Sequence, residues 1–196
     1  MTLSVIARKL RSFLCWRTRH RFYVLNSEPN PVESEMSLVI NCFTTCTADL
    51  SRVLRSIKCH DVTWAQRFRL GHSCYVASSR GEAVCYVWAS PRKWHLHNVN
   101  ERRLLAADVV FLYDVITVEK HRGKRALPTT MAYAMNDLRY RGYLRNCTLI
   151  EDRNVASQRC FTRVGYLPTD NTITIYRLFK LLNHRARSEG PPHSFL

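Results

Sequence analysis

A short basic segment at residues 120–125 is the part of the sequence whose residue types and spacing most clearly suggest chemistry. It reads Lys-His-Arg-Gly-Lys-Arg and so places four cationic side chains around one glycine. It lies between a β-branched apolar run at 108–118 and a helical pattern at 127–141. Because the first backbone N–H groups of a helix are unpaired and the helix dipole is positive there, this junction predicts a binding site for phosphate or pyrophosphate.

Two elements must position this segment, and the sequence predicts both of them. The run at 108–118 is almost continuously apolar, which is typical of a central strand covered on both faces. The helix at 127–141 tolerates Pro128 because that residue falls in the first turn, where its missing N–H has no intrahelical partner. Gly142 marks the end of this helix.

The remaining elements follow from caps, turns and the period of the apolar residues. In chain order we expect a helix at 49–58, hairpin strands at 73–77 and 83–89, a strand at 146–150, a helix from the Asn154 cap to Arg163, and a last strand at 172–179.

The N-terminal segment is strongly basic. Residues 1–27 contain six Lys or Arg and no Asp or Glu, and apolar residues recur among them at helical spacing. We therefore expect a basic amphipathic helix or arm here, with a short strand at 22–25. Such a segment can pack on its own domain, lie on an anionic membrane, enter RNA, or act as an organelle presequence.

Composition restricts the class of protein. A chain of 196 residues suits one domain, and no apolar run approaches the roughly 20 residues of a membrane-spanning helix. The 30 Lys and Arg against 15 Asp and Glu give a formal charge of +15, which favours an anionic partner. Eight singly placed cysteines without a Cys-x-x-Cys pair indicate reduced thiols, a cytoplasmic location and no metal site.

Two motifs, in this order, resemble the GNAT superfamily of N-acyltransferases. The first is the strand and turn from Tyr113 to Leu127, and the second is the helix that opens with Asn154 and leads into Gly165-Tyr166. In that family an Arg/Gln-x-x-Gly-x-Gly/Ala turn binds the pyrophosphate of acetyl-coenzyme A. The turn at 122–128 is similar to members with an Arg-Gly-basic-Gly-Leu-Tyr-Pro sequence.

The resemblance implies an α+β fold: a mixed, mostly antiparallel central sheet with helices on both faces, in three layers. It implies an acyltransferase domain at 31–182, preceded by a basic arm or first helix or strand at 1–30 and followed by a flexible tail at 183–196. The implied activity is direct transfer of an acetyl group from acetyl-CoA to an amine of a small molecule such as an amino sugar. An acyl carrier protein is an alternative donor, and the basic arm allows a membrane-peripheral location.

The resemblance also implies site residues. Backbone groups of Thr117 and Val118 would pair with the pantetheine arm, and Asn154 and Ser157 would line the thioester end. The pyrophosphate would be surrounded by the amides of six consecutive residues, namely Arg122, Gly123, Lys124, Arg125, Ala126 and Leu127.

Proton transfer from the amine needs a base close to the reacting atoms. Asp114 and Glu119 are candidates, because they lie on or beside the central strand, where bases of the family often sit.

Three residues depart from the family pattern. Arg125 and Leu127 stand where the family has small residues, so their side chains can obstruct the approach of the coenzyme, although the Arg125 guanidinium could instead clasp a phosphate. Phe161 stands where many members have a tyrosine that protonates the leaving thiolate. These departures favour an alternative function, a catalytically degenerate module of the same fold that binds nucleic acid or an anionic membrane through its basic surface.

Overall fold

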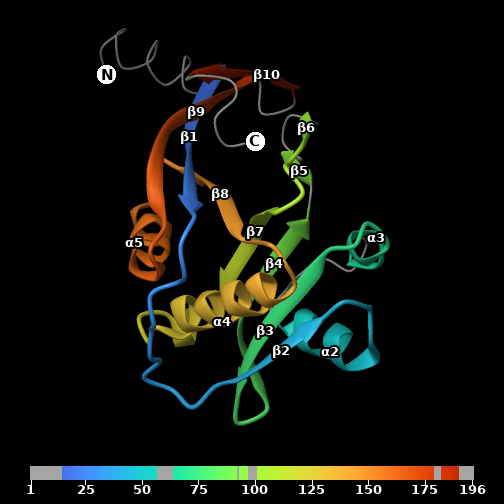
Figure 1. The fold of residues 1–196 in the computed structure, drawn as a ribbon. Coiled ribbons are helices and arrows are strands. Elements are labelled where there is room, and N and C mark those ends of the chain that lie inside the picture. Colours follow the sequence, from blue (N-terminus) through green and yellow to red (C-terminus); the bar gives the residue numbers. More distant parts are fainter. Residues whose placement is uncertain (1–14, 57–63, 92, 97–100, 179–181, 190–196) are drawn as a thin grey trace, which may run out of the picture.

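A computed structural model describes residues 15–56, 64–91, 93–96, 101–178 and 182–189 (Figure 1). Its strands are β1 (Cys15–Leu25), β2 (Val39–Phe43), β3 (Ser73–Ser79), β4 (Glu82–Pro91), β5 (Lys93–Leu96), β6 (Glu101–Leu104), β7 (Val109–Thr117), β8 (Arg145–Glu151), β9 (Leu167–Leu178) and β10 (Leu182–Glu189). Its helices are α2 (Ala48–Ser56), α3 (Trp64–Arg69), α4 (Ala126–Tyr140) and α5 (Val155–Val164), with a 3-10 turn η2 at Glu119–His121.

Eight strands form one sheet in the order β10-β9-β1-β8-β7-β4-β3-β2, and β5 pairs with β6 in a separate ribbon. All neighbours in the large sheet run antiparallel except β7 and β8, which are parallel. The predicted mixed, mostly antiparallel sheet is therefore confirmed.

Helices cover both faces of this sheet, as predicted. On one face, Met131 of α4 and Phe161 of α5 pack in one apolar cluster with Tyr75 and Leu112 of the sheet. On the other face, α2 and α3 pack against β3 and β4 in a second cluster that includes Trp88. Alternate residues of each strand point to opposite faces, so the sheet is the middle layer of three. No described helix has the length and apolarity that are needed to cross a bilayer.

The two helices of the candidate site begin and end where local chemistry predicts. The Asn154 side chain accepts a hydrogen bond from the Ser157 N–H and so caps α5. Pro128 lies within the first turn of α4. Gly142 and Gly165 follow the two helices with φ of +92° and +107°, a region that only glycine enters at little cost.

Gly165→Ala is expected to lower the free energy of unfolding by about 2 kcal/mol, and Gly142→Ala by about 1 kcal/mol. Both changes place a side chain at positive φ. However, a Cβ at Gly165 would lie 3.3 Å from Cδ1 of the buried Leu25, whereas a Cβ at Gly142 would meet nothing within 4 Å. Urea unfolding of the two variants measures the difference, and equal losses would contradict the packing argument.

The strand expected at 22–25 is confirmed and is longer than expected, because residues 15–25 form β1, which lies inside the sheet between β8 and β9. A first strand was one of the alternatives for 1–30, and the apolar residues at 3–14 on which the expected helix depends lie outside the described residues. The expectation of a flexible tail at 183–196 is wrong for the residues that the structure describes, since residues 182–189 form β10, which pairs with β9.

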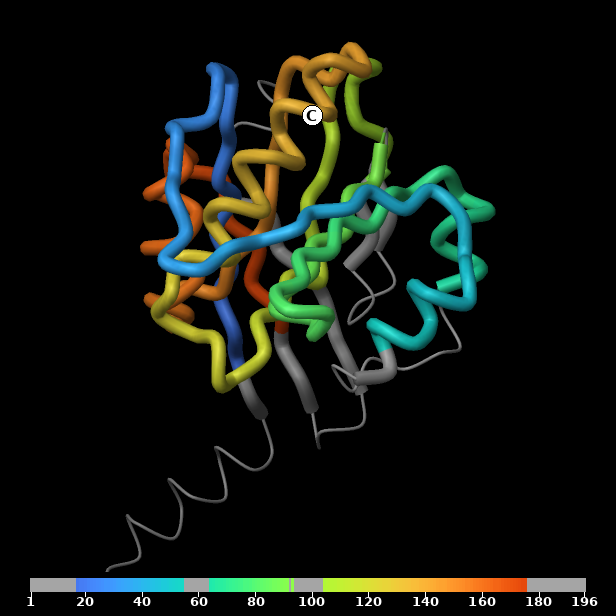
Figure 2. The backbone as a smooth tube through the Cα atoms, turned by 90° about the horizontal axis from the view of Figure 1, so that it is seen from below, coloured from blue at the N-terminus to red at the C-terminus, as the bar shows by residue number. Residues whose placement is uncertain are grey.

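The segment at 26–38, here called the strap, runs from the end of β1 along α4 to β2 (Figures 1 and 2). It has no regular secondary structure, as its acidic, proline-containing sequence predicts. The Asn30 N–H donates to the Val164 carbonyl at 2.8 Å, and the Ser34 hydroxyl and the Glu35 N–H donate to the Lys124 carbonyl, both at 3.2 Å. The strap therefore forms hydrogen bonds with both the C-terminal end of α5 and the turn before α4.

Candidate active site

The parallel strands β7 and β8 separate partway along their length. Their pairing runs from Val109–Arg145 to Leu112–Thr148, although β7 continues to residue 117 and β8 to 151. Beyond the last pair the two strands no longer bond to each other, so a wedge opens between them at the middle of the sheet. An extended ligand can enter such a wedge and bond to the free strand edges.

A β-bulge lies on β7 at the start of this wedge. On β4, Tyr86 pairs with Ile116 and Trp88 with Tyr113, so that Asp114 and Val115 together oppose one residue of β4. Asp114 has φ of +48°, which is unusual for a residue that is not glycine. Neither Asp114 nor Val115 has a ladder partner in the described strands on either side. A bulge of this kind leaves backbone groups free to bind a ligand.

The turn that follows β7 presents free backbone donors. After η2, Gly123 has φ of +81° and Arg125 has φ of +58°, and α4 begins at Ala126. Within the described chain, the N–H groups of residues 123–125 donate no backbone hydrogen bond. Those of the first helical residues are unpaired by geometry. The turn and the start of α4 thus have the strand–turn–helix geometry on which the predicted anion-binding junction depends.

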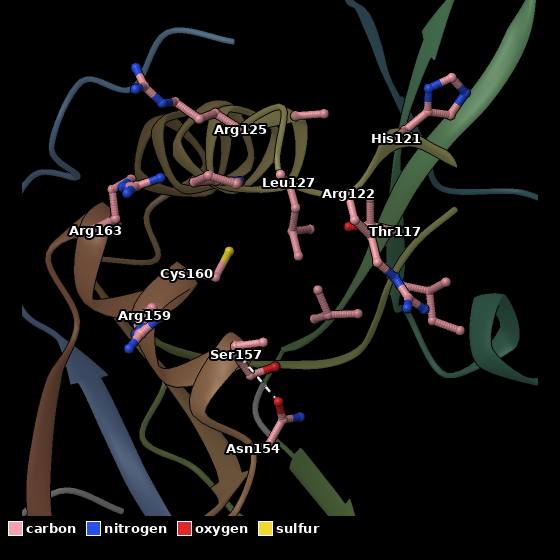
Figure 3. Close-up of a pocket in the computed structure, with 16 residues that line it drawn as sticks. Thr117, His121, Arg122, Arg125, Leu127, Asn154, Ser157, Arg159, Cys160 and Arg163 are labelled. Carbon is pink, nitrogen blue, oxygen red and sulfur yellow. Dashed lines mark hydrogen bonds between the residues drawn. The ribbon is translucent and has the colours of Figure 1, made fainter. Parts of the chain in front are cut away.

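The Arg125 side chain does not block this junction. It points away from the cleft in Figure 3, and its Nε lies 3.5 Å from Oε1 of Glu35 in the strap. The backbone of Arg125 adopts the left-handed region that favours glycine, which gives a physical reason for the glycine that the family has here. The Arg125 side chain therefore does not obstruct the cleft, contrary to that expectation.

The wedge, the turn and α5 together enclose a cleft of about 690 Å³ (Figure 3). Its walls are the end of β7, the turn with the first residues of α4, and one face of α5. No carboxylate is among the described residues that line it, and Arg122, Arg159 and Arg163 do line it; Arg125 contributes its backbone, since its side chain points toward Glu35. The helix dipole of α4 adds to this positive potential at the turn. The cleft therefore suits a polyanionic ligand with an extended arm.

Most of the predicted coenzyme-binding residues line this cleft. They are Thr117, Arg122, Gly123, Arg125, Ala126, Leu127, Asn154 and Ser157. Val118 and Lys124 do not, and the Val118 N–H already donates to the Val84 carbonyl at 2.9 Å. Phe161 is 2% exposed in the core, where its ring meets Tyr166 edge to face at 5.0 Å. It does not line the cleft.

The two candidate bases lie in different places. Asp114 faces α3, where its carboxylate forms an ion pair of 2.5 Å with Arg67 and lies 3.4 Å from the Tyr86 hydroxyl. Glu119 lies in η2 beside the turn, 3.9 Å from Arg122, with a side chain that is 90% exposed. The structure thus brings Asp114 to the bulge and Glu119 beside the turn, and neither is among the described residues that line the cleft.

Sequence reasoning missed three residues of α5 that line the cleft, namely Arg159, Cys160 and Arg163. Arg163 lies four positions after Arg159 and three after Cys160, so these three residues share one helix face, a signal that could have been read once the helix was predicted. Burial raises the pKa of Cys160 to about 12, so its thiol is protonated at neutral pH and is not a nucleophile. His121 also lines the cleft, although its ring points away from the centre in Figure 3.

Comparisons with known proteins show the fold. No protein-family model matches the chain, and no curated protein matches it in sequence. The chain does match solved structures in its fold. A GCN5-related N-acetyltransferase from Kribbella flavida aligns with a TM-score of 0.56 and 12% identity, over 86% of this chain and 62% of that protein. One from Sphaerobacter thermophilus aligns with a TM-score of 0.57 and 11% identity, over 90% of this chain and 56% of that protein.

A third structure is AAC(6')-Iy, solved in complex with the bisubstrate analog CoA-S-monomethyl-acetylneamine. It aligns with a TM-score of 0.53 and 17% identity, over 68% of this chain and 93% of that protein. The chain spans less than two thirds of the Kribbella and Sphaerobacter proteins. The fold is that of the GCN5-related N-acetyltransferases, so the resemblance to the GNAT superfamily is confirmed at the level of the fold.

Proposed function

We propose that this protein is a coenzyme A-dependent N-acyltransferase that transfers an acetyl group from acetyl-CoA directly to the amine of a small molecule, with amino sugars among the candidate acceptors. One observation carries the proposal. The wedge between β7 and β8 opens beside a turn with free backbone N–H groups, in a cleft lined by arginines and by no described carboxylate. A diphosphate with a long, amide-containing arm fits both parts.

The diphosphate would lie at the turn. There the N–H groups of residues 123–127 and the Arg122 guanidinium are available as donors, and charge-assisted hydrogen bonds of this kind are short and strong. Leu127 would contribute its backbone N–H, and its side chain, which points into the cleft in Figure 3, would lie against the ligand. The pantetheine arm would extend into the wedge past Thr117, and Asn154 and Ser157 at the start of α5 would lie beside the thioester.

The reaction would be a direct attack of the amine nitrogen on the thioester carbon. Binding both reactants in one geometry removes much of the entropic cost of the bimolecular step. A backbone N–H at the bulge, that of Asp114 or Val115, would donate to the carbonyl oxygen as negative charge develops on it, since neither residue has a ladder partner in β4. Thiolate is a good leaving group, so the buried Phe161 does not prevent turnover.

Acetyl-CoA at about 100 times its Kd is expected to raise Tm by roughly 5 to 10 °C, because ligand binding at that excess adds about 2.7 kcal/mol of stability. Gly123→Val should abolish this shift, because it places a side chain on the phosphate turn. Gly81→Val is the matched control. Gly81 and Gly123 have φ of +79° and +81° and open space around them, but Gly81 lies in the β3–β4 turn, outside the cleft.

Thermal unfolding at low and fixed salt measures these shifts. No shift with acetyl-CoA, together with a clear shift with RNA or anionic vesicles, would favour the alternative function as a non-catalytic module with a basic surface.

A further inference from the structure

Polar and aromatic side chains gather next to the bulge, on the sheet face that carries α2 and α3. Tyr113 precedes Asp114 in β7, and His72 directly precedes β3. The Tyr113 hydroxyl lies 2.6 Å from Nδ1 of His72, and Nε2 of His72 lies 3.0 Å from Oγ of Ser90. These three side chains are not among the described residues that line the cleft between β7, the turn and α5, which is called the donor cleft below because the acyl donor is proposed to bind there.

The hydrogen bonds of this group assign the proton positions. The Ser90 hydroxyl donates to the Lys93 carbonyl at 2.6 Å, so its oxygen is left to accept from Nε2–H of His72. A neutral imidazole that is protonated at Nε2 has an acceptor at Nδ1. The Tyr113 hydroxyl therefore donates to His72, which makes His72 the group in this chain of hydrogen bonds that is able to take up a proton.

Packing holds the Tyr113 ring in place. The Arg67 guanidinium lies over the Tyr113 ring at 5.0 Å and over the Trp88 ring at 4.8 Å. The Phe111 ring stacks on that of Tyr113 with centroids 6.2 Å apart. Burial raises the pKa of Tyr113 well above its ordinary value, so the hydroxyl stays protonated and remains a donor to His72 at neutral pH.

The approach of the acceptor connects this group to the reaction. The donor cleft opens on the face of α4 and α5, whereas Tyr113 points to the other face, where it packs with Trp88. A thioester that enters the wedge from the first face leaves its opposite side to the amine. An amine that attacks from there arrives at the bulge, beside Tyr113.

We propose that Tyr113 and His72 form a proton relay that accepts the proton of the attacking amine. This inference rests on the proposed acyltransferase function. The N–C bond forms and the C–S bond breaks, and the electron pair of the C–S bond leaves with sulfur. The amine proton passes to the Tyr113 oxygen while the Tyr113 hydroxyl proton passes to Nδ1 of His72. The imidazolium then loses its proton to water, and the coenzyme thiolate takes a proton from water.

Charged and titratable groups surround the relay on every element packed against it. The Arg67 cation opposes an imidazolium at His72, and the Asp114 carboxylate favours it. These two groups form an ion pair with each other at 2.5 Å. The groups that face the relay are Arg67 from α3, Cys74 from β3, Ser90 from β4, the Lys93 carbonyl from β5, and Asp114 from β7.

Initial rates of acetyl transfer from acetyl-CoA to glucosamine and to a panel of other primary amines, measured on the full chain across pH, test the relay. In the wild type the rate should rise with pH between about 5 and 8, where imidazoles titrate. His72→Gln and Tyr113→Phe should each lower kcat on the order of 100-fold and leave only the part of the rise that follows deprotonation of the acceptor amine, which shifts with the pKa of the amine used, with the KM for acetyl-CoA unchanged. The double variant should be no slower than either single one.

Tyr140→Phe is the matched control, because Tyr140 lies on α4 and is 94% exposed. A His72→Gln protein with the wild-type kcat and pH profile would overturn the relay. The relay would also be overturned if the variants lost kcat equally at every pH and lost unfolding free energy in urea in parallel, because that pattern is expected for a purely structural role. Failure of the wild type to bind acetyl-CoA or to acetylate any of the amines would overturn the acyltransferase function itself, and the relay with it.

Discussion

We expect the double variant Arg159→Glu/Arg163→Glu to bind acetyl-CoA at least about 100-fold more weakly than the wild type. It reverses the charge of both α5 arginines that line the cleft. Hydrogen bonds to charged groups contribute roughly 1.5–3 kcal/mol each, and 1.4 kcal/mol corresponds to about tenfold in Kd. Calorimetric titration at fixed salt measures the change. Arg153→Glu is the control, since Arg153 precedes α5 but lines a separate pocket with Arg17 and Arg19. Equal affinities in the double variant and the control would contradict this placement of the coenzyme.

The position of these arginines also provides a test that distinguishes the two possible acyl donors, acetyl-CoA and an acyl carrier protein. The strap donates hydrogen bonds to the carbonyls of Val164 and Lys124 from residues only a few positions apart, so the C-terminal half of α5 lies near the turn before α4. In the proposed binding mode, Arg159 and Arg163 would therefore lie close to the nucleotide end of the coenzyme, including its 3′-phosphate. The wild type should bind acetyl-CoA more tightly than acetyl-dephospho-CoA, and the double variant should bind both equally. A donor attached to a carrier protein has no such nucleotide and would show neither effect.

Phe161→Ala is expected to lower the free energy of unfolding by about 3–5 kcal/mol. Phe161 is 2% exposed and packs in the core cluster shared by α4, α5 and the sheet, so its removal leaves a cavity. Urea unfolding measures the loss, with Leu167→Ala as a control, because Leu167 is 65% exposed and should change stability by less than about 0.5 kcal/mol.

The same variant tests whether Phe161 contacts the coenzyme. Since Phe161 does not line the cleft, acetyl-CoA should still stabilise Phe161→Ala by about as much as it stabilises the wild type. A small loss of stability with a large loss of acetyl-CoA binding would show that the side chain contacts the ligand instead. Phe161→Tyr should gain no activity, because its hydroxyl would enter an apolar core rather than the cleft.

The Arg125–Glu35 pair shows how this chain accommodates a departure from the family pattern. The backbone at Arg125 keeps the left-handed conformation that a glycine would adopt freely. The cost of this conformation is of order 1–2 kcal/mol. The side chain then points toward the strap, where Glu35 lies 3.5 Å away, and the N–H groups of the turn stay accessible. The compensating residue lies 90 positions earlier in the chain.

Elements with local signals were predicted close to their observed positions. The helices α2, α4 and α5 and the hairpin of β3 and β4 differ from expectation by a few residues at most. Their caps, turn residues and apolar periods depend on neighbours within four positions, which the sequence displays directly. The basic turn between β7 and α4 belongs to this group, because it is defined by one strand, one glycine and one helix start.

The N-terminal strand could not be predicted in this way. Arg17, Arg19 and Arg21 fit a basic helix as well as a strand, because the pairing that decides between them is made with residues 146–151 and 167–178. β10 is similar, since its strand character depends on pairing with β9. Sheet formation depends on partners distant in sequence, and propensity is a weak guide where those partners decide.

The sequence by itself determined the helices α2, α4 and α5, the hairpin of β3 and β4, the basic turn and the positive charge that suits an anionic ligand. Only the tertiary structure decided that β7 and β8 separate, that Arg125 points to the strap and that Phe161 is core. It also brought His72, Ser90 and Tyr113 together across three segments of the chain. The physical reason is that caps and turns are set by bonds between near neighbours, whereas the direction and burial of a side chain depend on what the rest of the chain packs against it.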